Sequence, residues 1–254
     1  MLRRACLLSP LLGTVLPALA QAPAPALQLR TVQQSGSLVK YDPDGSPSRP
    51  GLCLEILRAV EKVDPGLRFT GLDQQVPLKR VERLLADGLV DVFFCLLRSP
   101  ERERQWRYVP VPLYVVRHVV VQRSDDTRRM ETLTELAAAS RTKPVLVMRG
   151  TALARRLTAA NVVINEVGSE REALEMLTRG RADAIYGQDI NLQRQVAETR
   201  LADKVRVGRN AFHEEPQYVA LRADLPAAHE ERLLQALKRL ERDGQLRQLA
   251  DKYR

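Results

Sequence analysis

The chain has 254 residues, of which 44% are hydrophobic and 28% are charged, and its formal net charge at pH 7 is +9. This composition supplies enough apolar residues for a packed core and excludes a wholly disordered chain. The basic residues are interspersed with acidic ones and form no block of five like charges. We interpret the net charge as a solvated, arginine-rich surface, with nucleic acid, an anionic membrane surface and an acidic ligand as the alternatives that a basic protein leaves open.

The first twenty residues have the features of a secretory signal. They begin with two arginines close to the start, continue with a mostly apolar stretch over residues 5–16 and end in the small-x-small sequence Ala18-Leu19-Ala20. The apolar stretch is interrupted, and it is shorter than the roughly 20 residues that a membrane span needs. We predict a signal peptide over residues 1–20, cleavage near Gln21 and a periplasmic mature protein, whose net charge falls from +9 to +7 as the two arginines leave.

Cleavage would remove Cys6 and leave Cys53 and Cys95. Two thiols in an oxidising compartment are candidates for a disulfide bond. Each also lies between apolar residues, where a buried unpaired cysteine packs as a small hydrophobic side chain, so both states stay open. Two thiols without a histidine cluster do not make a usual zinc site, and we predict neither a metal nor a cofactor.

Along the chain, short apolar runs alternate with stretches of helical period, which is typical of an α/β fold built from strand–helix–strand units. The expected strands cover residues 27–32, 67–70, 90–94, 119–122, 144–148, 162–167, 182–186 and 218–221. Four apolar stripes at three- and four-residue spacing predict amphipathic helices between and after them. The stripes are Leu54, Leu57 and Val60; Val81, Leu84 and Leu85; Ala173, Leu174 and Leu177; and Leu233, Leu234, Leu237 and Leu240. We interpret these stripes as core packing.

Residues 41–51 are rich in proline, glycine and serine and are expected to form a loop. A pattern of helix, glycine, short spacer, aspartate and strand occurs twice, at residues 84–94 and 177–186. Two similar segments of this kind indicate two similar lobes.

Six motifs occur in one order along the chain. They are Gly51-Leu52-Cys53-Leu54-Glu55; Leu85-Ala86-Asp87-Gly88-Leu89-Val90-Asp91-Val92; Ser99-Pro100-Glu101-Arg102 followed by Val109-Pro110-Val111-Pro112-Leu113-Tyr114; Arg149-Gly150-Thr151; Gly180-Arg181-Ala182-Asp183-Ala184; and Asp243-Gly244-Gln245-Leu246 with Lys252-Tyr253. Through them, nearly all of the mature chain resembles the family 3 extracytoplasmic solute-binding proteins that serve amino-acid ABC importers.

The resemblance implies a type II periplasmic binding fold, in which two Rossmann-like lobes are joined by two crossing strands and close on a ligand. Lobe 1 would comprise residues 27–115 and 211–254, and lobe 2 residues 116–210. It further implies a monomer that binds a small anionic molecule and delivers it to the membrane permease of an ABC importer.

Arg102 is the first candidate ligand-binding residue, because the resemblance implies that the arginine of this motif clamps the ligand carboxylate. A guanidinium suits this role, since its planar fork donates two parallel hydrogen bonds and stays charged. The alternative is a surface ion pair with Glu101, Glu103 or another acid. Gly150 and Thr151 follow a predicted strand and begin a helix, so their N–H groups could bind an anion from the opposite lobe. The alternative is that the two residues form only a turn with a helix cap.

Two positions depart from the family pattern. The first is Leu97, five residues before Arg102, at a position where the family commonly has a threonine or serine. The second is Gln188, followed by Asp189, at a position where the family often has an aspartate that binds the ligand ammonium. A neutral amide does not offset the desolvation of an ammonium as a carboxylate does. We therefore predict a carboxylate-bearing solute, amino-acid-like or another organic anion. Arg98 and Arg149, if they do not face solvent, would add positive charge.

Tyr41 is a candidate for one wall of the ligand cavity, and the alternative is a loop tyrosine on the surface. Tyr186 is a second candidate for the cavity wall, with the same alternative of a structural role only. His118 and His213 fall in the two expected crossings, where we interpret them as ordinary hinge residues.

Enzymes with the same fold, such as periplasmic dehydratases, make catalysis a second class of function. Glu55, Asp189 and His213 are the only acid–base candidates and no signature unites them, so we predict a binding protein and not an enzyme. A sensor subunit for a membrane partner is a further alternative. A nucleic-acid role is disfavoured, because the sequence has no helix-turn-helix pattern and no interleaved basic–aromatic patch.

Overall fold

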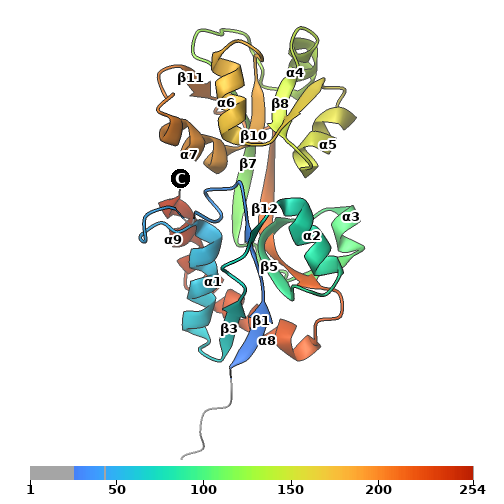
Figure 1. The fold of residues 1–254 in the computed structure, drawn as a ribbon, viewed down its shortest axis with the longest axis vertical. Helices are drawn as coiled ribbons and strands as arrows, with labels where there is room; N and C mark the ends of the chain where they lie inside the picture. Colours follow the sequence, from blue (N-terminus) through green and yellow to red (C-terminus); the bar gives the residue numbers. More distant parts are fainter. Residues whose placement is uncertain (1–25, 43, 254) are drawn as a thin grey trace, which may run out of the picture.

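The computed structural model describes residues 26–42 and 44–253, so the signal peptide predicted over residues 1–20 lies outside the described part. Two α/β bodies are stacked along the long axis of the molecule (Figure 1). Strands β7 (Tyr114–Arg123) and β12 (His213–Arg222) run side by side between them. These two strands pair antiparallel from His213 opposite His118 to Gln217 opposite Tyr114. The expected lobe boundaries at 115/116 and 210/211 lie at these strands, and the division into lobes stays a prediction.

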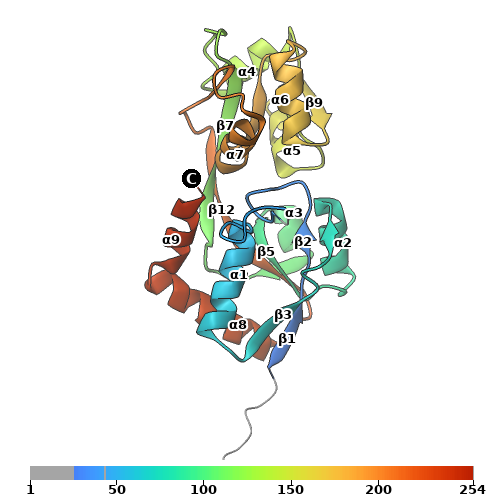
Figure 2. The same ribbon diagram turned by 60° about the vertical axis from the view of Figure 1, so that its left-hand side comes forward.

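The first body is built from both the early and the late part of the chain. Its elements are β1 (Leu27–Arg30), β2 (Gln33–Gln34), α1 (Leu52–Val63), β3 (Leu67–Thr70), β4 (Gln75–Val76), α2 (Leu78–Ala86), β5 (Val92–Leu97), α3 (Pro100–Glu103), β6 (Trp106–Tyr108), α8 (Ala227–Arg242) and α9 (Gln245–Lys252). Helices α8 and α9 pack against α1, as Figure 2 shows from another side. All six residues of β5 are buried, and β5 pairs antiparallel with β12.

The second body comes from the middle of the chain. Its elements are α4 (Leu133–Ser140), β8 (Val145–Met148), α5 (Ala152–Ala159), β9 (Ile164–Val167), α6 (Glu170–Thr178), β10 (Ile185–Gln188), α7 (Asp189–Thr199) and β11 (Val205–Val207). The strand order β5-β12-β7-β10-β8-β9 continues from the first body into the second through the two long strands. Within it, β10, β8 and β9 run parallel, so the turns after them converge on the edge that faces the first body.

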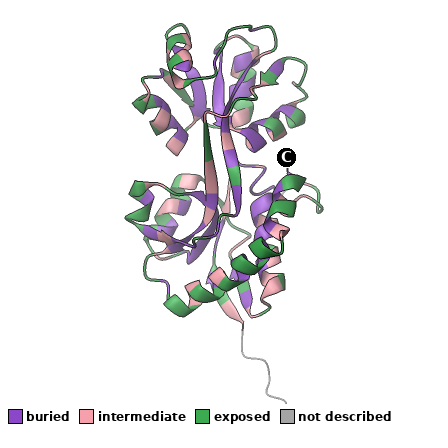
Figure 3. Cartoon of the chain, turned by 180° about the vertical axis from the view of Figure 1, so that it is seen from behind, coloured by how far each residue is buried: buried purple, intermediate pink, exposed green. Residues whose placement is uncertain are grey.

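The four apolar stripes lie on α1, α2, α6 and α8, where most of their residues are buried. Figure 3 shows the buried residues on the strands and the inner helix faces. All eight expected strands are present, and residues 67–70 match β3 in full. Strands β2, β4, β6 and β11 were not predicted, because each has only two or three residues, too few for a recognisable pattern. No helix among the described residues is long and apolar enough to cross a membrane.

Cys53 on α1 and Cys95 on β5 form a disulfide bond with an S–S distance of 2.06 Å. Both residues are fully buried. Of the two states that the sequence left open, the structure contains the bridged one. It ties the first helix of the body to a fully buried strand.

Candidate ligand-binding site

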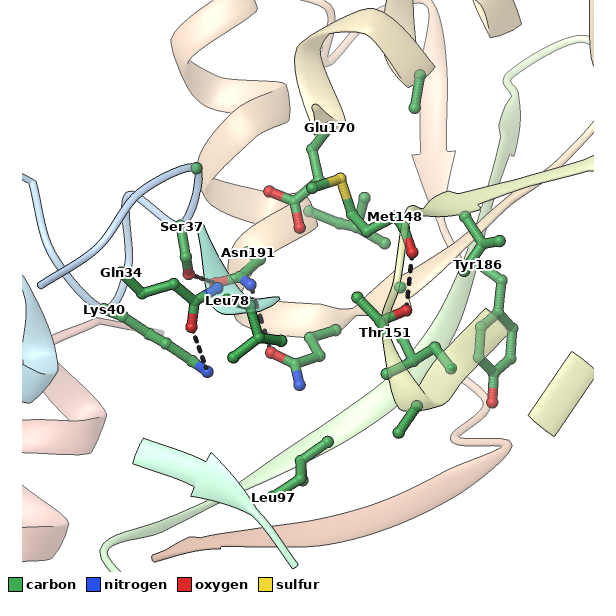
Figure 4. Close-up of a pocket in the computed structure, with 18 of the residues that line it drawn as sticks. Gln34, Ser37, Lys40, Leu78, Leu97, Met148, Thr151, Glu170, Tyr186 and Asn191 are labelled. Atoms are coloured by element: carbon green, nitrogen blue, oxygen red, sulfur yellow. Dashed lines mark hydrogen bonds between the residues drawn. The ribbon is translucent and has the colours of Figure 1, made fainter. Parts of the chain in front are cut away.

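A cavity lies between the two bodies, and both contribute to its wall (Figure 4). Its volume is about 80 Å³, whereas one water needs only about 10–15 Å³. Residues of the first body that line it are Gln34, Gly36, Ser37, Lys40, Leu78, Leu96, Leu97 and Arg102. The second body contributes Thr151, Glu170, Tyr186, Gln188 and Asn191 among others. The space therefore suits a small metabolite and not a polymer.

Arg102 lines this cavity from α3, which begins after the N-cap residue Ser99. Its side chain is buried and its Nε and Nη2 groups donate to one carboxylate oxygen of Glu82, at 3.1 and 2.6 Å. Its Nη1 group donates to the carbonyl oxygen of Leu97 at 2.9 Å. A guanidinium has five N–H groups, so one on each Nη has no partner among the described residues. The acid that pairs with Arg102 is Glu82, and neither Glu101 nor Glu103 does so.

Leu97, Thr151 and Gln188 also line the cavity. The Thr151 hydroxyl is the N-cap of α5: it accepts from the Ala154 N–H and donates to the Met148 carbonyl at 2.8 Å. The Gln188 amide oxygen accepts from the Asn191 side chain at 3.3 Å. Leu97 presents an apolar wall. These three residues, with Arg102, are the predicted site residues that the fold brings together.

The structure differs from the prediction at Gly150. This residue has a φ of 70° in the turn after β8, but it does not line the cavity between the bodies. Its N–H donates to the Glu166 carboxylate at 2.8 Å, because β8 and β9 pair parallel and bring Glu166 beside the turn. The neighbouring Arg149 donates to the Glu166 carbonyl at 3.2 Å. An internal carboxylate therefore takes the place predicted for an anionic ligand at Gly150.

Tyr41 also differs from both alternatives that the sequence offered. It is 2% exposed and packs against Phe93 with ring centroids 6.2 Å apart, so it neither lines the cavity nor rests on the surface. The Lys40 and Tyr41 N–H groups both donate to the Ser37 carbonyl. This tight turn directs Lys40 to the cavity and Tyr41 into the core.

The remaining polar candidates have partners elsewhere in the described chain. Arg98 pairs with Glu103, Asp189 with Arg117, His213 with Glu215 and Glu55 with Lys252. None of these four candidates lines the cavity. Tyr186 does line it, and its hydroxyl lies 3.2 Å from Nδ1 of the buried His118. Acid–base catalysis by Glu55, Asp189 and His213 has no geometric support here.

Lys40 is a cavity residue that the sequence reasoning missed. It is 6% exposed, and its Nζ donates to the Cys95 carbonyl at 2.8 Å and to the Gln34 side chain at 3.5 Å. Burial and, to a smaller extent, the charge of Arg102 lower the pKa of Lys40 to about 7. An ammonium has three N–H groups, which leaves one for a ligand.

Glu170 is the second residue that was missed. It is half-buried at the start of α6, lines the cavity and accepts a hydrogen bond from Asn191. Burial raises the pKa of Glu170 to about 7, while the Asn191 hydrogen bond and the charge of Lys40 act in the opposite direction. A carboxylate and an ammonium therefore share one small cavity, each from a different body.

Two polar contacts close the cavity between the bodies. The Ser37 hydroxyl donates to the Asn191 side chain at 3.4 Å, and the Arg194 guanidinium donates to the Asp42 carboxylate at 3.0 Å. In both pairs one residue belongs to the segment before α1 and the other to α7. The structure is thus a closed form of the two bodies.

No protein-family model and no curated protein matches the chain, whereas many solved structures do. A protein described as a binding component of an ABC transporter from Wolinella succinogenes, in complex with lysine, matches with a TM-score of 0.73 at 16% identity, over 89% of this chain and 94% of that one. This shared architecture decides the fold. The chain has the type II periplasmic binding protein fold. The sequence resemblance is confirmed at this level.

Two further structures with the same fold have other descriptions. A histidine kinase sensor domain similar to periplasmic binding proteins matches with a TM-score of 0.73 at 21% identity, over 90% of this chain and 96% of that one. An ancestral amino-acid-binding protein, described as a precursor of cyclohexadienyl dehydratase, gives 0.71 at 20% identity, over 89% and 95%. Most of the similar structures are binding proteins, but the type II fold also serves sensing and enzyme lineages.

Proposed function

We propose that this protein binds a small carboxylate-bearing solute in the periplasm and delivers it to the permease of an ABC importer. The observation that carries the proposal is the cationic side of the cavity: two guanidinium N–H groups of Arg102 and one ammonium N–H of Lys40 have no partner among the described residues. A carboxylate offers four lone-pair sites to such donors.

The lobe division 27–115 with 211–254, and 116–210, fits this proposal, because the cavity lies between these two parts. Two similar structures, one described as the substrate-binding protein of an amino-acid ABC transporter and one as a binding component of an ABC transporter, support delivery to an importer. The signal sequence supports export. We propose that the carboxylate bridges Arg102 of lobe 1 and the N-terminal end of α5 at Thr151 in lobe 2.

The first experiment identifies the ligand. Thermal-shift screening of the mature protein against amino acids, dicarboxylates and aromatic acids should reveal a stabilising solute, since a ligand at about 100 times its Kd adds about 2.7 kcal/mol of stability. Calorimetry of Arg102→Ala should then show affinity lower by about tenfold to a hundredfold. Arg104→Ala, an exposed neighbour outside the cavity, is the matched control. Unchanged affinity in Arg102→Ala contradicts the proposal.

A further inference from the structure

We infer that the second body carries a separate binding site for a multivalent oxyanion, in a pocket between β11 and the segment that follows β7. The pocket has a volume of about 430 Å³, whereas the cavity between the bodies has about 80 Å³. A volume of this size is within the usual range of small-molecule sites. Four arginines line the pocket, and Glu131 is the only acid among the described residues that do so. The inference goes beyond the proposed function and does not depend on it.

The backbone gives the pocket its shape. Strand β11 pairs antiparallel with β7 in the second body (Figure 1). Directly after β11, the Gly208 N–H donates to the Val120 carbonyl at 2.7 Å, and a Cβ on Gly208 would lie 2.9 Å from that oxygen. The chain can approach β7 this closely because Gly208 has no side chain. On the other side, the Asn210 side chain donates to the Glu131 carbonyl. The two walls of the pocket are therefore tied together by the fold.

Two of the four arginines have no acidic partner. Arg209 is exposed and makes no side-chain hydrogen bond or ion pair with any described residue. Within the same part of the chain, the Arg206 guanidinium donates only to two backbone carbonyls, those of Asp126 and Arg128. A carbonyl group carries no net charge, so it does not cancel the charge of the guanidinium. Two positive charges in the pocket are therefore uncompensated.

The other two arginines are held by acids. The Arg128 guanidinium donates to both carboxylate oxygens of Asp126, at 2.9 and 2.6 Å, and lies 3.0 Å from Asp183. Its Nη1 group has no partner among the described residues. Arg129 pairs with Glu131 at 2.8 Å. Because Arg129 engages the acid of the pocket, that acid does not neutralise the two unpaired arginines.

This distribution of charge favours a ligand with two or more negative charges. Each guanidinium can donate parallel hydrogen bonds to a phosphate or a carboxylate group. A ligand with a single charge would leave one of the two unpaired arginines, Arg206 and Arg209, without a counterion. Buried Val120 and Met130, with half-buried Phe212, add an apolar wall for an organic part of the ligand. The chemistry therefore fits a phosphorylated or polycarboxylate molecule.

The pocket is distinct from the cavity between the bodies. No residue lines both. The Phe212 ring of the pocket packs edge-on against the ring of the cavity residue Tyr186, with centroids 5.5 Å apart. These two rings separate the two sites, so each can be occupied or disabled independently of the other.

The test is calorimetry of the mature protein at low salt with inorganic pyrophosphate and with citrate. We expect at least one of them to bind with a Kd below about 1 mM, and acetate, with one charge, to bind at least about tenfold more weakly. Arg206→Ala and Arg209→Glu should each weaken binding about tenfold or more. Arg209 has no side-chain partner to lose, so Arg209→Glu tests the site even if Arg206→Ala does not fold. Preference for pyrophosphate identifies a phosphorylated ligand, and preference for citrate identifies a polycarboxylate.

Two controls locate the binding. Arg181→Ala removes an exposed arginine of the second body that lies outside the pocket, and it should leave the affinity unchanged. Arg102→Ala disables the cavity between the bodies and should also leave it unchanged, so the outcome does not depend on the proposed function. The inference is overturned if neither multivalent probe binds, if acetate binds equally well, if Arg209→Glu retains full affinity, or if Arg102→Ala abolishes binding.

Discussion

Asp42 and Arg194 lie 152 residues apart in the sequence, yet their side chains meet at 3.0 Å between the two bodies. Asp42 is buried and the Arg194 side chain is 25% exposed. The pair joins the segment before α1 to helix α7, so it exists only while the two bodies are closed. It stabilises the closed form without touching the cavity wall.

Arg194→Ala should weaken ligand binding through closure alone. A partly buried ion pair contributes about 1 kcal/mol to the stability of the closed form. Because the ligand binds the closed form, losing this pair weakens ligand binding by the same free energy, which raises the Kd about threefold to tenfold. Stopped-flow measurements should show the loss mainly as faster dissociation. Arg239→Ala, whose pair with Asp243 stays within one helix, is the control. An Arg194→Ala protein with unaltered dissociation would show that this contact does not govern closure.

Glu82→Gln tests the pairing of Arg102. Removing this carboxylate leaves a buried guanidinium without its counterion, and such changes cost several kcal/mol in fully buried pairs. Because the Glu82 side chain is 16% exposed, we expect a smaller loss of about 1–3 kcal/mol in urea unfolding. The freed positive charge should at the same time tighten carboxylate binding. Unchanged stability would mean that solvent already screens the pair.

The ligand-free protein should show a dependence of stability on pH that Lys40 and Glu170 create. The folded pKa of Lys40 is about 7, below its usual 10.5, so the unfolded chain binds more protons between these values and stability rises with pH there. The folded pKa of Glu170 is about 7, above its usual 4.5, so stability falls as pH rises between 4.5 and 7. Their joint contribution has its minimum near neutral pH.

Urea unfolding of Lys40→Met and Glu170→Gln across this range measures the two effects separately. In Lys40→Met, the increase in unfolding free energy above pH 7 should be smaller by more than about 1 kcal/mol. In Glu170→Gln, the decrease in unfolding free energy between pH 4.5 and 7 should be smaller by more than about 1 kcal/mol. Glu175→Gln, which removes an exposed carboxylate from the same helix as Glu170, should follow the unaltered protein throughout. Parallel pH profiles of all four proteins would contradict the burial of these two charges.

The Cys53–Cys95 bridge should be present in protein recovered from the periplasm. Thiol titration of the denatured, unreduced chain should find no free thiol, and two free thiols would contradict the bond. Because the bridge spans a sequence separation of 42 residues, replacing both cysteines by alanine should cost about 2–4 kcal/mol of unfolding free energy. Reduction of the unaltered protein should cost a similar amount.

The regular elements were predictable because their signals are local. The stripe from Leu233 to Leu240 has helical spacing whatever surrounds it, and it lies on α8 as expected. The crossing strand β7 is longer than the apolar run that predicted it: the strand covers Tyr114–Arg123, whereas the run covers only residues 119–122. Polar residues such as Arg117 continue the strand where it runs between the bodies. There the hydrogen-bonded pairing with β12 extends the strand, and alternate residues, Tyr114 and Val116, remain buried.

The site was predictable only in part, for a related reason. Ordered motifs located Arg102, Thr151, Leu97 and Gln188, and all four line the cavity. Lys40 and Glu170 gave no signal, because a lysine in a polar loop and a glutamate at a helix start normally face solvent. The Lys40 ammonium reaches the Cys95 carbonyl, 55 residues away, and the cavity at Glu170 is lined by both bodies; no local pattern records such long-range contacts.

The strand order carries a consequence for how the chain is made. The buried strand β5 can pair with β12 only when the last fifth of the chain is present, whereas the second body is complete within itself apart from its edge with β12. Long-range pairings of this kind form slowly. Cys53 and Cys95 both precede β12 in the sequence, so their bond can hold α1 against β5 before β5 pairs with β12. The cross-link then holds these two elements together while the rest of the first body folds, and it remains part of the folded molecule.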